Sequence, residues 1–176
     1  FEIANGSYNA ATGAFTEDGR TMLLEGAGNT RLADQVLVQL SKAPAAGKTV
    51  VLDVVMDSAT DDQVQLLNPA ADARLQQVNG KWRITFTSSN WNSPVLIGLE
   101  ARDDARKEDF ATFRISFARN AATTDANWVL PNFRAGNAVL DVEVFDNDTA
   151  GLVVVESNGG TVLTRDNPQT DVNEGL

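Results

Sequence analysis

The chain has 176 residues, with 24 Asp and Glu against 14 Lys and Arg, a formal net charge of -10, and neither His nor Cys. A chain of this length can bury a hydrophobic core of its own. The lack of Cys and His excludes disulfides, thiolate zinc sites, cysteine nucleophiles and histidine bases, and the acidic balance disfavours nucleic acids and anionic membranes as partners. Divalent cations are the partners that this charge favours.

The first residues carry neither an initiator Met nor the basic and apolar regions of a signal peptide. No apolar run approaches the ~20 residues that a membrane-spanning helix needs, so we predict no membrane insertion. We therefore expect an internal or processed piece of a larger secreted or surface protein. Without disulfides, such a protein needs another stabilising device, and bound calcium is one.

Short runs of alternating apolar residues recur along the chain, separated by Gly, Asn, Asp and Pro, and this pattern predicts an all-β, antiparallel β-sandwich of seven or eight strands. No segment of 12 residues has the period of an amphipathic helix. The first strand is expected near residues 21–24 and a weak one near 64–67. The other predicted strands have as inward sets Val36, Val38 and Leu40; Val50, Leu52, Val54 and Met56; Trp82, Ile84 and Phe86; Val95, Ile97 and Leu99; Phe113, Ile115 and Phe117; and Ala138, Leu140, Val142 and Val144.

Two tryptophans, Trp91 and Trp128, lie among Asn, Ser and Thr in predicted loops. Each either anchors its loop to the core or presents a ring on which a sugar stacks. The anchor is the favoured interpretation, because a Trp ring buries a large apolar area and usually closes the edge of a core.

A partial internal repeat indicates a modular parent protein. Residues 16–18 (TED) lead to Glu25-Gly26, and residues 164–166 (TRD) lead to Glu174-Gly175. The match rests on about a dozen residues with ordinary turn chemistry, so chance similarity stays open. We expect residues 1–20 to be a lead-in from a preceding segment, 21–148 a sandwich, and 149–176 a linker and the opening strand of a following repeat.

Carboxylates gather where predicted strands end. Calcium takes six to eight oxygen ligands and would offset the repulsion within such clusters. The alternative is a set of solvated turns, in which Asp and Asn bond to their own backbone. The clusters are Glu25; Asp57 with Asp61 and Asp62; Asp103 and Asp104 with Glu108 and Asp109; and Asp146-Asn147-Asp148.

Four segments together resemble the Calx-β domain: residues 84–87 (ITFT), 95–104 (VLIGLEARDD), 108–115 (EDFATFRI) and 142–148 (VEVFDND). Glu25-Gly26 and residues 34–44 (DQVLVQLSKAP) are similar to the opening strands of that family. The resemblance covers about residues 21–148, with gaps. It implies an immunoglobulin-like sandwich that binds Ca²⁺ at one end.

Carried over position by position, the resemblance implies a metal site formed by Glu25, Asp57, Asp103, Asp104, Glu108, Asp146 and Asp148. The segment after Asp57 departs from the family pattern, so Asp61 or Asp62 could take its place. Asn147 interrupts the final acidic triplet but offers a carbonyl oxygen. Arg106 and Lys107 bring two cations beside the site, which either weaken the metal or make it unnecessary.

The resulting hypothesis is a calcium-binding structural repeat, an extender module of a large bacterial adhesin-like protein that is secreted or displayed on the cell surface. Its expected partners are calcium and adjacent repeats of the same chain, while other domains would bind a host or surface glycan or protein. The alternative is a carbohydrate- or protein-binding module that uses the loop tryptophans. An enzyme is disfavoured, because the loop pair Asp103 and Glu108 more readily shares a cation than spans a substrate.

Overall fold

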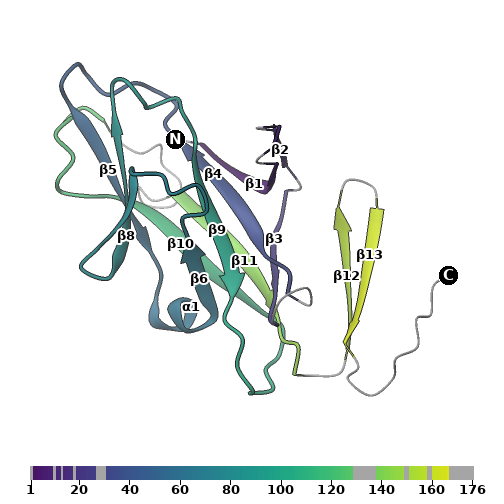
Figure 1. The fold of residues 1–176 in the computed structure, drawn as a ribbon. Coiled ribbons are helices and arrows are strands. Elements are labelled where there is room, and N and C mark those ends of the chain that lie inside the picture. The colour runs from purple at the N-terminus through teal and green to yellow at the C-terminus, as the bar shows by residue number, and fades with distance from the viewer. Residues whose placement is uncertain are drawn as a thin grey trace.

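The computed structural model describes residues 2–9, 11–12, 14–17, 19–26, 31–128, 138–148, 151–157 and 160–166; of 2–5, 7–8, 151–157 and 160–166 it gives only the course of the backbone. These residues form an all-β sandwich, as predicted, with strands of two sheets facing each other (Figure 1). The first sheet contains, in spatial order, β2 (Ala14–Glu17), β1 (Glu2–Asn9), β4 (Asp34–Gln39), β9 (Val95–Ala101) and β6 (Val64–Leu67).

The second sheet has six strands and carries the parts of the chain that matter most for the site. Its order is β3 (Thr21–Leu24), β11 (Ala138–Phe145), β10 (Ala111–Arg119), β5 (Thr49–Val55), β8 (Lys81–Thr87) and β7 (Leu75–Val78). All of its pairings are antiparallel except that of β11 with β3, which is parallel. The predicted antiparallel arrangement is therefore wrong at this one edge of the second sheet.

The core lies between the two sheets and is built from the alternating positions that the sequence predicts. Val38, Leu52, Ile84 and Val95 are each fully buried, and Phe117 is 1% exposed. Met56, Trp82 and Phe113, at the ends of their inward sets, are only partly buried against this core. Period-2 alternation therefore identifies the core-facing side of each of these strands.

The two sheets contain eleven strands among the described residues, so the prediction of seven or eight is too low: it lacks β1, β2 and β7. Strand β7 lies at the outer edge of the second sheet. It pairs with β8 through the turn at Asn79 and Gly80, whose φ angles are 52° and 77°. Two successive positive φ angles are the requirement of a type I′ hairpin turn, and Asn-Gly is its preferred sequence. Only Leu75 is buried in this strand, so the apolar alternation is too weak to reveal it.

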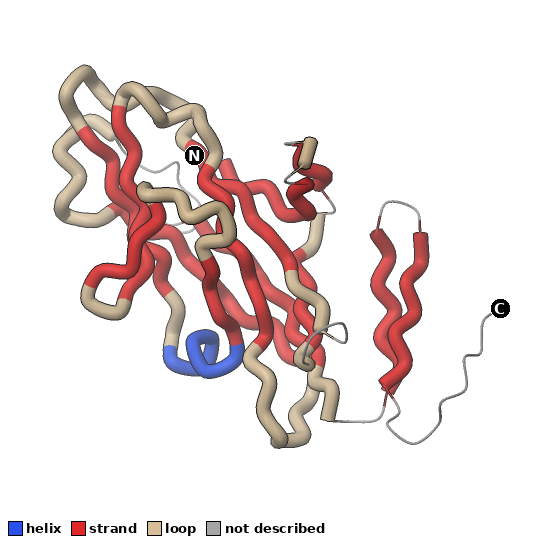
Figure 2. Tube along the Cα trace, viewed as in Figure 1, coloured by secondary structure: helices blue, strands red, loops and turns tan. Residues whose placement is uncertain are grey.

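Residues 58–63 form the one helix among the described residues, α1 (Ser58–Gln63). No helix in the described part of the chain is long and apolar enough to cross a membrane. The helix, blue in Figure 2, lies at the end of the sandwich where the loop between β9 and β10 also projects. Arg102, at the start of that loop, donates its backbone N–H to Gln63 O at 2.9 Å, which joins the helix to the loop.

Both ends of the chain contribute hairpins. The predicted lead-in, residues 1–20, adds strands β1 and β2, and β1 pairs with β4 of the sandwich. In the predicted linker and opening strand, residues 149–176, two strands pair with each other: β12 (Gly151–Ser157) and β13 (Gly160–Asp166). Figure 1 shows this hairpin as a separate two-stranded sheet.

Candidate metal centre

The parallel pairing of β3 with β11 brings two acidic residues to one edge of the second sheet. Leu24 lies opposite Phe145 at the ends of the two strands. The next residues, Glu25 and Asp146, leave the sheet side by side, because parallel strands end at the same edge. The Glu25 backbone N–H donates to Phe145 O at 3.0 Å and so continues the ladder of hydrogen bonds between the two strands. This hydrogen bond fixes the position of the Glu25 backbone beside the end of β11.

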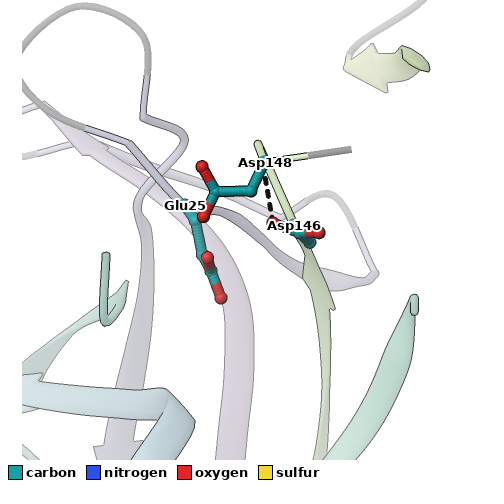
Figure 3. Close-up of side chains that lie close together, drawn as sticks. All are labelled: Glu25, Asp146 and Asp148. Atoms are coloured by element: carbon teal, nitrogen blue, oxygen red, sulfur yellow. Dashed lines mark hydrogen bonds between the residues drawn. The ribbon is translucent and has the colours of Figure 1, made fainter. Parts of the chain in front are cut away.

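Asp148 completes a group of three carboxylates with Glu25 and Asp146. One carboxylate oxygen from each lies within 4.8 Å of the other two, and Figure 3 shows the three side chains together. Glu25 is 1% exposed, and the two aspartates are partly buried. A carboxylate removed from water beside two others is costly unless a cation or a proton compensates its charge.

The backbone around the group is held by the Asp146 carboxylate itself. Its Oδ1 accepts the N–H of Asp148 at 2.7 Å, and its Oδ2 accepts the N–H of Glu108 at 2.8 Å. One side chain thus joins the end of β11 to the loop of residues 102–110. Phe110, at the end of that loop, packs its ring against Phe145 with centroids 4.9 Å apart.

Glu25 Oε2 and Asn147 Oδ1 are buried at this place and have no hydrogen-bond partner in the described part of the chain. The side-chain amide nitrogen of Asn147 donates to Asp103 Oδ1 at 3.2 Å, which identifies the other atom of that amide, Oδ1, as the acceptor. Buried polar atoms without partners are rare and call for an explanation such as a bound ion. Carboxylate and amide oxygens are the ligands that Ca²⁺ uses.

The electrostatics of the group act mainly on Glu25. Burial, followed by the negative charges of Asp146, Glu108, Asp104 and Asp148, raises its pKa from 4.5 to about 7. The charged form is therefore disfavoured by both desolvation and like charges. The same four carboxylates would favour a cation placed beside Glu25.

The raised pKa predicts how the stability of the chelated protein depends on pH. Between the unfolded value of 4.5 and the folded value of about 7, the folded state binds more protons at Glu25 than the unfolded state does. The contribution of Glu25 to the free energy of unfolding therefore falls as the pH rises through this window. In urea unfolding in chelator, the free energy of unfolding should fall less between pH 4.5 and about 7 for Glu25→Gln than for the wild type. An identical fall in the two proteins would contradict this prediction.

The other predicted ligands of the loop between β9 and β10 lie around the group rather than in it. Asp103 contacts Asn147, as described, and is exposed. Asp104 Oδ1 accepts the N–H of Arg106 at 2.7 Å, and Arg106 lies 3.9 Å from Glu108 Oε1. The Arg106 side chain is 78% exposed, so this pair is weak, and Lys107 is exposed as well. Arg106 therefore offers Glu108 little compensation of its charge.

Asp57 is not brought into the group of three. Its Oδ1 accepts the N–H of Thr60 at 2.8 Å as the N-cap of α1, and hydrogen bonding by the side chain and then the backbone of Thr60 lowers the pKa of Asp57. Neither alternative residue joins the group: Asp61 lies 4.0 Å from the Arg102 guanidinium, and Asp62 is exposed on the helix. The carboxylate of Asp57 therefore caps the N-terminus of α1, a position at which Asp is a preferred residue.

We expect Asp57→Ala to destabilise the fold modestly and to leave any calcium response unchanged. The substitution removes the cap of α1 but no oxygen of the group formed by Glu25, Asp146 and Asp148. Urea unfolding in chelator and in calcium measures both effects at once. Loss of the calcium response in this variant would show that Asp57 is a ligand after all.

No protein-family model matches the sequence, and no curated protein matches it. Among solved structures, EndoBT-3987 of Bacteroides thetaiotamicron with a Man5GlcNAc product is similar to 85% of this chain, with 12% identity and a TM-score of 0.42. The chain spans about a third of that protein, 32% of its length. A likeness at this level carries no argument about function.

The tryptophans pack on the core, as the favoured interpretation predicts. Trp128 is 6% exposed and its indole N–H donates to Lys42 O at 3.4 Å. Trp91 is partly buried against the core, and its carbonyl accepts the N–H of Leu40 at 3.1 Å. Both rings therefore pin loops to the sandwich.

Proposed function

We propose that this chain is a calcium-binding structural module whose ion is held by Glu25, Asp146 and Asp148. The observation that carries the proposal is the fully buried Glu25 carboxylate, with Oε2 lacking a hydrogen-bond partner among the described residues and two more carboxylates beside it. An ion there would compensate the buried charge and supply the missing partner.

The ligand types favour calcium over other metals. Zinc and the later transition metals select Cys and His ligands, and the sequence contains neither. Calcium accepts six to eight oxygens in flexible geometry, and the Asn147 amide oxygen offers one ligand beyond the three carboxylates. Asp103, Asp104 and Glu108 surround the group and would add to the attraction. Magnesium requires a near-ideal octahedron and binds such irregular sets less readily.

The place of the group in the fold favours a structural role for the ion. It lies where β3 and β11 end and where the loop of residues 102–110 returns to the second sheet. An ion bound there would join three segments and oppose their local unfolding, because it binds only the folded arrangement. Asp148 also immediately precedes the connection to β12, so the ion would fix the path by which the chain leaves the sandwich.

The wider setting we propose is an extender module in a secreted or cell-surface, adhesin-like protein, with no catalytic role. The resemblance of residues 21–148 to the Calx-β domain supports this setting, as does the partial repeat around Glu174. Sugar binding through Trp91 or Trp128 is the second candidate, but no observation favours it, since both rings pack on the core.

Calorimetric titration of the chain with Ca²⁺ tests the proposal, with Mg²⁺ as the competing ion. Calcium should bind, and Glu25→Gln should weaken binding at least about tenfold, since the buried ligand loses its charge. Asp141→Asn is the matched control: it removes one negative charge from β11, at a pair with Arg114 that is more than half exposed on both sides. Equal affinity in wild type and Glu25→Gln would reject the site.

A further inference from the structure

A groove opens between the two sheets at the side where each of them ends in a short strand. The edge strand of the first sheet is β6 and that of the second sheet is β7, with four residues each. Residues of both strands line the groove, together with the end of β5 and the start of β8, and its volume is about 380 Å³. This size lies within the range of ~300–1,000 Å³ that is typical of small-molecule sites.

The apolar part of the lining includes one aromatic ring. Trp82 and Met56 are only partly buried against the core, and Val55 is 42% exposed. The indole N–H of Trp82 has no acceptor among the described residues, whereas that of Trp128 donates to Lys42 O at 3.4 Å. Trp82 therefore offers the groove both apolar ring surface and a hydrogen-bond donor.

The charged part of the lining is positive on balance, in a chain whose net charge is -10. Lys81 and Arg102 contribute two cations, against the one carboxylate of Asp61. Asp61 lies 4.0 Å from the Arg102 guanidinium, and the two side chains are 64% and 46% exposed, so this pair is weak. Asp53 is bound by Arg83 at 2.9 Å, and Lys81 forms no salt bridge within the described part of the chain. The groove therefore favours an anionic ligand.

Two amide side chains also line the groove, Gln65 from β6 and Gln77 from β7. Gln77 lies opposite Trp82 in the pairing of β7 with β8, so the two side chains are on the same face of the sheet. An aromatic ring flanked by amides suits a pyranose sugar, whose C–H face is apolar and whose hydroxyls donate and accept hydrogen bonds. A carboxylate on such a sugar would pair with the cations, and Arg can hold a carboxylate through two parallel N–H bonds.

An extended peptide fits this groove less well than a sugar does. A peptide that binds as an added strand uses the backbone of an open sheet edge. Both edge strands at the groove have only four residues, and very short edge strands are poor templates for another strand. Recognition by the side chains of the lining is therefore favoured over strand addition.

We infer that this groove binds a sugar that bears a carboxylate, of the uronic acid class. The sugar ring would stack on Trp82, and its carboxylate would pair with Lys81 and Arg102. The ligand and the residues that hold it are separate from those of the candidate metal centre. The inference therefore does not rest on calcium.

The test is a titration of the isotope-labelled chain, freed of calcium, with digalacturonate, followed by nuclear magnetic resonance. Of the indole N–H signals, the one that Trp82→Phe removes should shift on binding, and that of the buried Trp128 should not. Lys81→Gln should weaken binding about threefold, because it removes an exposed charge that contacts the ligand. Lys48→Gln is the matched control: it removes an exposed cation just before the other end of β5 and should leave binding unchanged.

Two further probes separate the charge from the sugar, and the sugar from a peptide. The dimethyl ester of digalacturonate keeps the rings and removes both charges, so it should bind at least about tenfold more weakly. No shift of the Trp82 signal in excess digalacturonate, equal binding of the ester, or equal weakening by Lys48→Gln would overturn the inference. So would tighter binding of an acetylated peptide of alternating Leu and Glu, which would identify a peptide groove. Since calcium is absent from all samples, none of these outcomes bears on the calcium proposal.

Discussion

In excess calcium, the protein is expected to melt about 5–10 °C higher than in chelator at neutral pH. A ligand that binds only the folded state adds about 2.7 kcal/mol of stability at a hundredfold excess over its dissociation constant, and a chain of this size gains about 2–4 °C per kcal/mol. Glu25→Gln should lose most of this increase, because the buried carboxylate is the central ligand.

The same substitution should have the opposite effect in chelator. Glu25 then carries an uncompensated charge close to Asp146 and Asp148, and its pKa of about 7 reflects that cost. Glutamine keeps the shape and removes the charge, so Glu25→Gln should melt at or above the wild-type temperature in chelator. Thermal unfolding of wild type, Glu25→Gln and the Asp141→Asn control gives both comparisons. A variant that is less stable than wild type in both conditions would indicate a merely structural Glu25.

Asp146→Ala should destabilise the protein even without calcium, by about 1–3 kcal/mol, since it leaves two backbone donors without their acceptor. These donors are the N–H groups of Glu108 and Asp148, each now bound to one Asp146 oxygen. The loop of residues 102–110 would lose its bond to the end of β11. The same variant should also lose calcium binding.

The pH at which Asp146→Ala is measured decides how clearly the effect appears. At neutral pH, removing this charge also relieves repulsion on Glu25, which masks part of the loss. Urea unfolding in chelator at about pH 5.5, where Glu25 is protonated, isolates the broken hydrogen bonds. Asp146→Asn retains one oxygen acceptor and should fall between Asp146→Ala and wild type. Equal stability of all three proteins would contradict the role of Asp146 as a link between loop and strand.

Much of the fold could be predicted because its strands alternate strictly. Period 2 predicts that alternate residues of a strand are buried, and this holds for Val36 and Val38 and for Ile84 and Phe86. The sequence pattern therefore identifies the inner face of each sheet. Strand β7 was not predicted, because Leu75 is its single buried residue and the strand therefore shows no apolar alternation. The dipeptide Asn79-Gly80 could have indicated this strand, since Asn-Gly favours the two-residue turn of a β-hairpin.

The composition of the site was predictable, whereas its assembly was not. Glu25, Asp146 and Asp148 were all candidate ligands, because acidic residues at strand ends suit calcium. Their convergence depends on the parallel pairing of Leu24 with Phe145, two residues far apart in the chain. Nothing in either strand specifies that partner, since pairing is set by how the two sheets pack as a whole.

Asp57 illustrates the opposite case, in which a local signal was available. An Asp at the start of a short polar segment is a common helix N-cap, and the structure has Asp57 in that position. The resemblance assigned the carboxylate to a metal, while the local backbone uses it to begin α1. A local hydrogen bond of this kind competes directly with a distant ligand for the same oxygen atoms.

Crystallisation of the chain with Ca²⁺, with the ion located by its anomalous scattering, tests the central claim most directly. We predict one ion bonded to carboxylate oxygens of Glu25, Asp146 and Asp148 at about 2.3–2.6 Å, with Asn147 Oδ1 as a further ligand. An ion held only by exposed carboxylates of the loop of residues 102–110, or no ion beside Glu25 in crystals soaked to saturation, would contradict the account.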